Sequence, residues 1–325
     1  MNLSPLVFGN VYSAAPWGGR WIAALFGRTD APEVCSESWE LSGHPFGMSV
    51  VSKGVYAGRT LASLTEEFGS DLIGTKAPDK ARFPLLVKLL DARRSLSVQV
   101  HPNLENAAAT GGEAKTEAWY ILAAAPGASL YAGTVAGAAA ADFRAAAEQG
   151  ETVIGMLKRH PAKAGDVLYI PGGVVHAIGA GCLVFEVQQS SNTTYRLYDW
   201  DRVDEKGVGR KLHIDESLKS IDYTFPEVKI QRANLELVEG ANRWLTLVAS
   251  PFFKLRELNL ADSVKVAMDG STFLSVFVLD GALKVSTPAG ACHVLRGGGA
   301  LVPAAAGGCE LEADIAGTRL LVTTL

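Results

Sequence analysis

The sequence predicts a mainly β fold in which short strands form a sandwich or barrel, with only a few short helices. Two observations support this class. Short runs rich in Val, Leu, Ile and Tyr recur through most of the 325 residues, and Gly, Pro or Asp residues bound them. After about residue 235 the sequence shows strand patterns alone, at the regular spacing that is typical of sandwiches and barrels.

Strands are expected in both parts of the chain. The clearest in the first part are LSVQV at 96–100, AWYIL at 118–122, DVLYI at 166–170 and CLVFEVQQ at 182–189. The last part contains FKLRELNL at 253–260, FLSVFVLDGALKVS at 273–286, HVLRGGGALVPA at 293–304 and TRLLVTTL at 318–325. Turn residues separate these runs, which are expected to be short strands.

Helical patterns occur at three places. TLASLTEEFG at 60–69 has a Thr at its start and a Gly at its end, and AAADFRAAAEQG at 139–150 is rich in Ala and ends at Gly. DESLKSID at 215–222 opens with Asp, and we expect it to form a short helix that links the larger part of the chain to the C-terminal part.

A chain of this length is longer than one hydrophobic core usually serves, so we expect two domains, residues 1–235 and residues 236–325. The segment GDVLYIP at 165–171 resembles GGGALVP at 297–303. If the two segments are equivalent strands, His176 of the first domain corresponds to Gly308 of the second.

Composition excludes several classes of partner. The chain has 30 basic and 34 acidic residues, a net charge of -4 and no long block of one sign, which argues against nucleic acid or an anionic membrane as the main partner. It has no secretory pattern at its start and no apolar stretch near the roughly 20 residues of a membrane helix. The four cysteines are scattered singly, so we expect a reduced, cytoplasmic enzyme.

Four residues on neighbouring expected strands could bind a metal. Gln99 and His101 lie two apart and therefore share a strand face, Glu117 begins the next strand, and His176 follows a Gly-rich turn. Such mixed nitrogen and oxygen ligands suit Zn²⁺ with an open position, although Mn²⁺, Fe²⁺ or Co²⁺ could occupy the site. The alternative is that the histidines are hydrogen-bonded barrel residues. Their occurrence together with Glu and Gln favours the metal.

Polar residues concentrate in EVQQSSNTTYRLYDWDR at 186–202, which includes Glu186 and Arg196. An arginine can hold a phosphate or a developing oxyanion with paired hydrogen bonds. Ordinary surface ion pairs are the alternative, and Asp201 and Arg202 look more structural. Lys115 shares the strand face of Glu117 by the same spacing of two.

The motifs resemble, in order, those of type I mannose-6-phosphate isomerases in their short bacterial form. They are FPLLVKLLDARRSLSVQVHPN, KTEAWYIL, GDVLYIPGGVVHAIGAG and the segment 186–202. PWGGRW and ESWELSGHP near the N-terminus resemble the opening strands of that family. The resemblance runs from about residue 5 to residue 220, and the rest fits the family's second domain. It implies two cupin-like jelly-roll β-barrel domains, of which only the first binds metal.

Carried over residue by residue, the resemblance implies one zinc ion per chain, bound by Gln99, His101, Glu117 and His176. It implies that Arg196, Glu186 and Lys115 are catalytic, and that Ser97 and Lys115 bind the phosphate of the substrate. One departure concerns Asn192, which stands where some relatives have Asp.

The expected reaction interconverts mannose 6-phosphate and fructose 6-phosphate through an enediol, with Glu186 or a metal-bound water as the base. The expected partner is a small sugar phosphate, and the chain is expected to be a monomer or a homodimer. Two other classes are a sugar-binding cupin without activity and a metal-dependent dioxygenase. Lys115 and Arg196 argue against the first, and the Gln ligand fits the second poorly.

Overall fold

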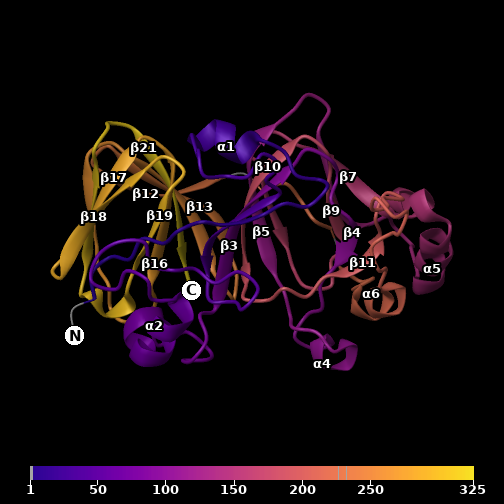
Figure 1. Cartoon of the computed structure of the whole chain (residues 1–325), viewed down its shortest axis with the longest axis horizontal. Coiled ribbons are helices and arrows are strands. Elements are labelled where there is room, and N and C mark those ends of the chain that lie inside the picture. The colour runs from indigo at the N-terminus through magenta and orange to yellow at the C-terminus, as the bar shows by residue number, and fades with distance from the viewer. Residues whose placement is uncertain (1–2, 226, 232) are drawn as a thin grey trace.

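The computed structural model describes residues 3–225, 227–231 and 233–325. Its main feature is four antiparallel sheets arranged as two pairs, one pair from each part of the chain (Figure 1). The mainly β class predicted from the sequence is confirmed. Among the described residues, no helix has the length and apolar character that a membrane crossing requires.

The first pair combines a six-stranded and a five-stranded sheet. The six-stranded sheet has the order β1 (Val11–Ser13), β2 (Glu37–Ser42), β3 (Leu85–Ala92), β10 (Cys182–Gln189), β5 (Glu117–Ala124) and β8 (Val167–Ile170). The five-stranded sheet has the order β11 (Tyr195–Tyr198), β4 (Val98–Val100), β9 (His176–Ile178), β6 (Ser129–Thr134) and β7 (Leu157–Pro161). A core that includes Leu90, Trp119, Leu130 and Ile178 fills the space between them.

The second pair repeats this arrangement. Its six-stranded sheet has the order β12 (Asn234–Glu239), β13 (Asn242–Ala249), β14 (Lys254–Leu260), β21 (Thr318–Thr324), β16 (Leu274–Asp280) and β19 (Gly299–Val302). Its four-stranded sheet has the order β15 (Ser263–Val266), β20 (Cys309–Ala313), β17 (Ala282–Thr287) and β18 (Gly290–Leu295). A separate core that includes Leu258, Val276, Leu283 and Leu311 lies between these two sheets.

The two similar segments of the sequence form equivalent strands. β8 and β19 are each the last strand of a six-stranded sheet. In the first sheet Ile170 pairs with Glu117, and in the second Val302 pairs with Leu274. His176 opens β9, and Gly308 immediately precedes the corresponding strand β20.

The two sheet pairs pack against each other through an apolar core shared by both six-stranded sheets. Phe185 of β10 meets Phe277 of β16, with ring centroids 5.2 Å apart. The strands β3 and β10 are therefore buried along their whole length, apart from the partly buried last residue of β10. This explains why both strands are nearly continuous apolar runs, and why a charged residue within them requires a specific partner.

The helices are short and lie at the margins of the sheets. They are α1 (Trp21–Phe26), α2 (Leu61–Phe68), α3 (Ser70–Ile73), α4 (Ala107–Thr110), α5 (Ala140–Glu148) and α6 (Ile214–Ser220), with 3₁₀ turns at Gly150–Met156 and Ala304–Ala306. Helices α4, α5 and α6 gather at the end of the molecule that faces away from the second sheet pair (right in Figure 1). Thr60 caps α2 by accepting a hydrogen bond from the Ser63 amide.

Most predicted elements are confirmed, with four corrections. β4 covers only Val98–Val100, and α6 begins one residue before the predicted Asp215. The last part of the chain is not made of strands alone, because a 3₁₀ turn follows β19. PWGGRW does not form a strand: it is a turn that leads into α1, because the buried Asp91 carboxylate accepts a hydrogen bond from the Trp21 amide. A Cβ atom at Gly19 would displace that carboxylate from its place beside the Trp21 amide.

Candidate metal centre and active site

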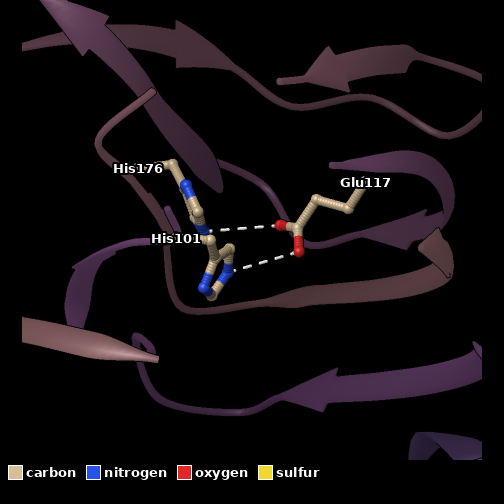
Figure 2. A group of neighbouring side chains, drawn as sticks. All are labelled: His101, Glu117 and His176. Carbon is tan, nitrogen blue, oxygen red and sulfur yellow. Dashed lines mark ion pairs between the residues drawn. The ribbon is translucent and has the colours of Figure 1, made fainter. Parts of the chain in front are cut away.

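Three of the four predicted metal ligands converge inside the first sheet pair (Figure 2). His101 follows β4, Glu117 opens β5 and His176 opens β9, so each side chain is fixed at the end of a strand. Nε2 of His101 lies 3.3 Å from Oε2 of Glu117, and Nε2 of His176 lies 3.4 Å from Oε1. All three side chains are buried, and their candidate ligand atoms lie within 4.8 Å of one another.

The fourth predicted ligand, Gln99, lies at the edge of this cluster. It is directly opposite His176 in the paired strands β4 and β9, and its Nε2 lies 3.3 Å from Nε2 of His176. Its Oε1 accepts a hydrogen bond of 3.1 Å from Ser97. A half-turn of the amide would direct Oε1 at the cluster instead.

The backbone sets the tautomer of both histidines. Nδ1 of His101 lies 2.7 Å from the Thr193 carbonyl oxygen, and Nδ1 of His176 lies 2.9 Å from that of Val174. Each Nδ1 therefore donates to a carbonyl and each Nε2 faces the cluster without a proton, which is the form that binds metals. Burial, reinforced by the Lys115 ammonium, lowers the pKa of His101 to about 3.

The donor set fits a divalent cation. Within the described residues, neither oxygen of the fully buried Glu117 carboxylate has a hydrogen-bond partner. The Lys115 ammonium, 2.7 Å from Oε2, compensates this buried charge in part, and a divalent cation between the carboxylate and the two unprotonated imidazole nitrogens would compensate it further. Two nitrogen ligands, one carboxylate and an amide oxygen match the first-row divalent metals.

A cavity of about 310 Å³ lies beside the cluster. All the other predicted site residues line it: Ser97, Gln99, Lys115, Glu186, Asn192 and Arg196. Sequence reasoning missed the other residues of this wall, which include Trp17, Glu37, Lys88, Arg210 and His213. One signal could have found Lys88, because it is the lysine within the apolar run LLVKLL, where a buried charge needs a partner.

One end of the cavity carries a chain of alternating charges. Nζ of Lys88 lies 3.4 Å from Glu37 and 3.5 Å from Oε1 of Glu186. Nζ of Lys115 lies 3.8 Å from the same Oε1 and 2.7 Å from Glu117. Burial, together with the nearby Glu117 carboxylate, raises the pKa of Glu186, although both lysines oppose this shift.

The other end of the cavity carries an excess of positive charge. Nε of Arg196 donates a hydrogen bond of 3.3 Å to Ser97, and Nε of Arg210 donates one of 2.7 Å to Asp199. Arg202 also pairs with Asp199, so two guanidinium groups share this carboxylate, whereas Arg196 donates to Ser97 and to the Lys211 carbonyl oxygen. Burial, with a contribution from Arg210, lowers the pKa of Arg196, as expected where like charges are held together.

Asp201 and Arg202, the two residues that looked structural in the sequence, lie outside the cavity wall. Arg202 donates to the Ser95 carbonyl oxygen at 2.6 Å, and Asp201 accepts a hydrogen bond of 2.9 Å from Tyr198. Trp200 and Asp201 both have positive φ angles, 57° and 50°, so this segment makes a tight left-handed turn just before the arginines.

The sequence comparisons agree with one another. Residues 7–128 match the family described as phosphomannose isomerase type I, catalytic domain. The mannose-6-phosphate isomerase of Streptococcus mutans is 40% identical over 271 residues, 83% of each chain. The mannose-6-phosphate isomerase ManA of Bacillus subtilis is 37% identical over 315 residues, 96% of this chain and 97% of that one.

Solved structures show the same architecture. A crystal structure of the mannose 6-phosphate isomerase from Bacillus subtilis has a TM-score of 0.88 and 30% identity, and the match covers 99% of this chain and 100% of that one. A putative mannosephosphate isomerase from Archaeoglobus fulgidus has a TM-score of 0.76 at 22% identity over 98% of this chain and 97% of that one, a likeness of fold alone.

Proposed function

Because this chain belongs to the type I phosphomannose isomerase family, we propose that it interconverts mannose 6-phosphate and fructose 6-phosphate. The observation that carries the proposal is the buried His101–Glu117–His176 cluster beside a cavity with an acidic group and an excess of guanidinium groups. A metal-dependent aldose–ketose isomerase that acts on a sugar phosphate uses all three features: a cation site, a base and an anion site.

Glu186 is the proposed base. The reaction moves a proton between C2 and C1 of the open-chain sugar through an enediol. Glu186 lines the cavity, and its Oε1 has no hydrogen-bond partner in the described part of the chain, so this oxygen is free to accept that proton. Its raised pKa brings it closer to neutrality, where a general base works best.

Gln99, His101, Glu117 and His176 would hold the metal. A bound divalent cation would polarise the carbonyl and hydroxyl oxygens at C1 and C2. Arg196 lies beside Ser97, which in turn contacts the proposed ligand Gln99. We propose that Arg196 stabilises the negative charge that develops on the sugar oxygens.

The phosphate is proposed to bind at the end of the cavity where Ser97 meets Arg196 and Arg210. Arg196 makes no ion pair within the described residues, and Arg210 shares the Asp199 carboxylate with Arg202, so this end of the cavity carries an excess of positive charge that suits a phosphate dianion. Lys115 was expected to share this role. Its ammonium is already paired with Glu117 at 2.7 Å, so we assign it to the reacting carbons rather than to the phosphate.

Zinc, one ion per chain, is the proposed native metal. A reducing compartment such as the cytoplasm is also proposed, because Cys35, Cys182, Cys292 and Cys309 are all free and three of them are buried. We further propose that the first two sheets are the catalytic domain, that the second two are a domain without metal ligands, and that the chain acts as a monomer or homodimer.

The test is isomerisation of mannose 6-phosphate by the purified protein, before and after chelation and after Zn²⁺ is restored. Activity that disappears with the metal and returns with it would support the proposal. Full zinc occupancy without turnover would contradict it and favour a sugar-binding cupin. Oxygen consumption with a redox-active metal would favour a dioxygenase.

A further inference from the structure

We propose that Trp119 is a positioning residue that fixes the orientation of the Glu186 carboxylate, so that a single oxygen of this group faces the reacting carbons. The inference rests on the proposed function, in which Glu186 is the base. Trp119 does not line the cavity, so its effect on the reaction would act through Glu186.

Strand pairing brings the two side chains together. Trp119 of β5 is directly opposite Glu186 of β10 in the antiparallel register. Side chains of directly opposite residues project from the same face of a sheet, and their Cβ atoms lie about 5 Å apart. Here Nε1 of the indole donates a hydrogen bond of 2.9 Å to Oε2 of Glu186.

The two oxygens of Glu186 therefore have different surroundings. Oε2 accepts from the indole, whereas Oε1 has no hydrogen bond within the described residues. The nearest cations to Oε1 are Lys88 at 3.5 Å and Lys115 at 3.8 Å, which is too long for strong hydrogen bonds. These ion pairs alone would leave the carboxylate free to rotate, so the indole hydrogen bond decides which oxygen faces the cavity.

An indole suits this role because its N–H only donates and does not ionise near neutral pH. It can therefore hold Oε2 without competing for the proton that Oε1 accepts. Trp119 is itself rigid: it is fully buried in the core between the sheets, and its ring meets His176 edge to face at 5.3 Å. A rigid donor holds the base within the narrow range of geometry that proton transfer requires.

The test compares Trp119→Phe with Trp244→Phe. Trp244 is a matched control in the second sheet pair, because it is also buried and its Nε1 donates to Glu239 at 3.3 Å. Trp119→Phe is expected to lower kcat by about 10-fold to 100-fold, with KM and zinc content changed by less than about twofold. Trp244→Phe is expected to leave kcat and KM unchanged. The isotope effect on kcat with substrate deuterated at C2 should increase in Trp119→Phe, because proton transfer becomes slower.

A double variant separates positioning from packing. If Trp119 acts through Glu186, then Trp119→Phe causes no further loss of kcat in a Glu186→Gln background. The inference would be overturned if the double variant lost kcat by the product of the two single losses. It would also be overturned if Trp119→Phe lost zinc in parallel, or if kcat of Trp119→Phe were unchanged.

An NMR measurement that does not depend on turnover distinguishes this inference from the proposed function. The indole N–H resonance of Trp119, assigned by its loss in Trp119→Phe, is expected to move upfield in Glu186→Ala, while that of Trp244 stays in place. An unmoved Trp119 resonance overturns the inference even if the wild-type protein is an active isomerase. A wild-type protein without isomerase activity contradicts the proposed function whatever the resonance does.

Discussion

Nζ of Lys115 lies 2.7 Å from Oε2 of Glu117, and both side chains are buried. Only one residue separates them on the chain. The ammonium partly compensates a carboxylate that also faces two imidazoles. Glu117 is therefore the residue on which cation binding should depend most strongly.

Glu117→Gln is expected to weaken zinc binding by about 100-fold or more, because it removes the only carboxylate of the cluster. Competition with a chromogenic chelator measures the affinity. Glu312→Gln, which changes a half-exposed carboxylate paired with Lys284, is the control and should bind zinc normally. Stoichiometric zinc in Glu117→Gln after dialysis against chelator would contradict the assignment.

Glu186→Gln is expected to lower kcat by about 100-fold to 10,000-fold, because an amide cannot accept the proton from the sugar. Zinc affinity should be almost unchanged, since the carboxylate is not part of the ligand cluster. Steady-state kinetics together with metal analysis checks both statements. Unchanged turnover would remove Glu186 from the role of base.

The pH dependence of kcat/KM should report the same group. Glu186 must be deprotonated to act as a base, so activity falls as the pH falls through its pKa. Burial and the Glu117 carboxylate raise that pKa, against the opposing effect of Lys88 and Lys115. We therefore expect the acid limb of the kcat/KM profile at a pH above about 4.3, the pKa of an exposed glutamate. This limb should be absent from the residual activity of Glu186→Gln. An acid limb that persists unchanged in this variant would assign it to another group.

Arg210→Met is expected to raise KM for mannose 6-phosphate by about 5-fold to 50-fold, because a charge-assisted hydrogen bond to the phosphate is lost. Competitive inhibition by inorganic phosphate should weaken in parallel. Arg20→Met, which removes an exposed arginine paired with Glu33, is the control and should leave KM unchanged. An unchanged KM in Arg210→Met would exclude Arg210 from the phosphate site.

Arg28→Met is expected to lower the free energy of unfolding by about 3–5 kcal/mol. Arg28 makes two hydrogen bonds of 2.8 and 2.9 Å to the buried Glu40, and it also donates to the Gly297 carbonyl oxygen in the second sheet pair. The substitution leaves the Glu40 carboxylate buried without its partner. Urea unfolding of Arg28→Met and of a double variant with Glu40→Leu measures the cost, and the double variant should recover part of it.

The sequence predicted the strands wherever an apolar run ended in a turn signal. CLVFEVQQ coincides with β10, and the similarity between segments 165–171 and 297–303 predicted equivalent strands at two sheet edges. PWGGRW was misassigned because its shape depends on Asp91, which lies 70 residues from Trp21 in the chain. A turn held by such a distant side chain leaves no local signature.

The candidate metal cluster and six residues of the cavity wall were predicted because they lie in short motifs. The missed residues reach the site by tertiary packing. Glu37 enters through its pairing with Lys88 across β2 and β3, and Arg210 through its hydrogen bonds to Asp199. Local spacing carries no information on such contacts, although a lysine inside a fully buried strand was a signal that could have been used.

In the repeated strand order of the described residues, only the first half carries the candidate cation site, whereas the equivalent place in the second half contributes to packing alone. Leu274 stands where the first half has the proposed ligand Glu117, and it is a buried apolar residue. The second half is thus a natural scaffold for engineering. A histidine and a carboxylate introduced there would form a second cation site, and the His101–Glu117–His176 cluster would serve as its internal reference in the same molecule.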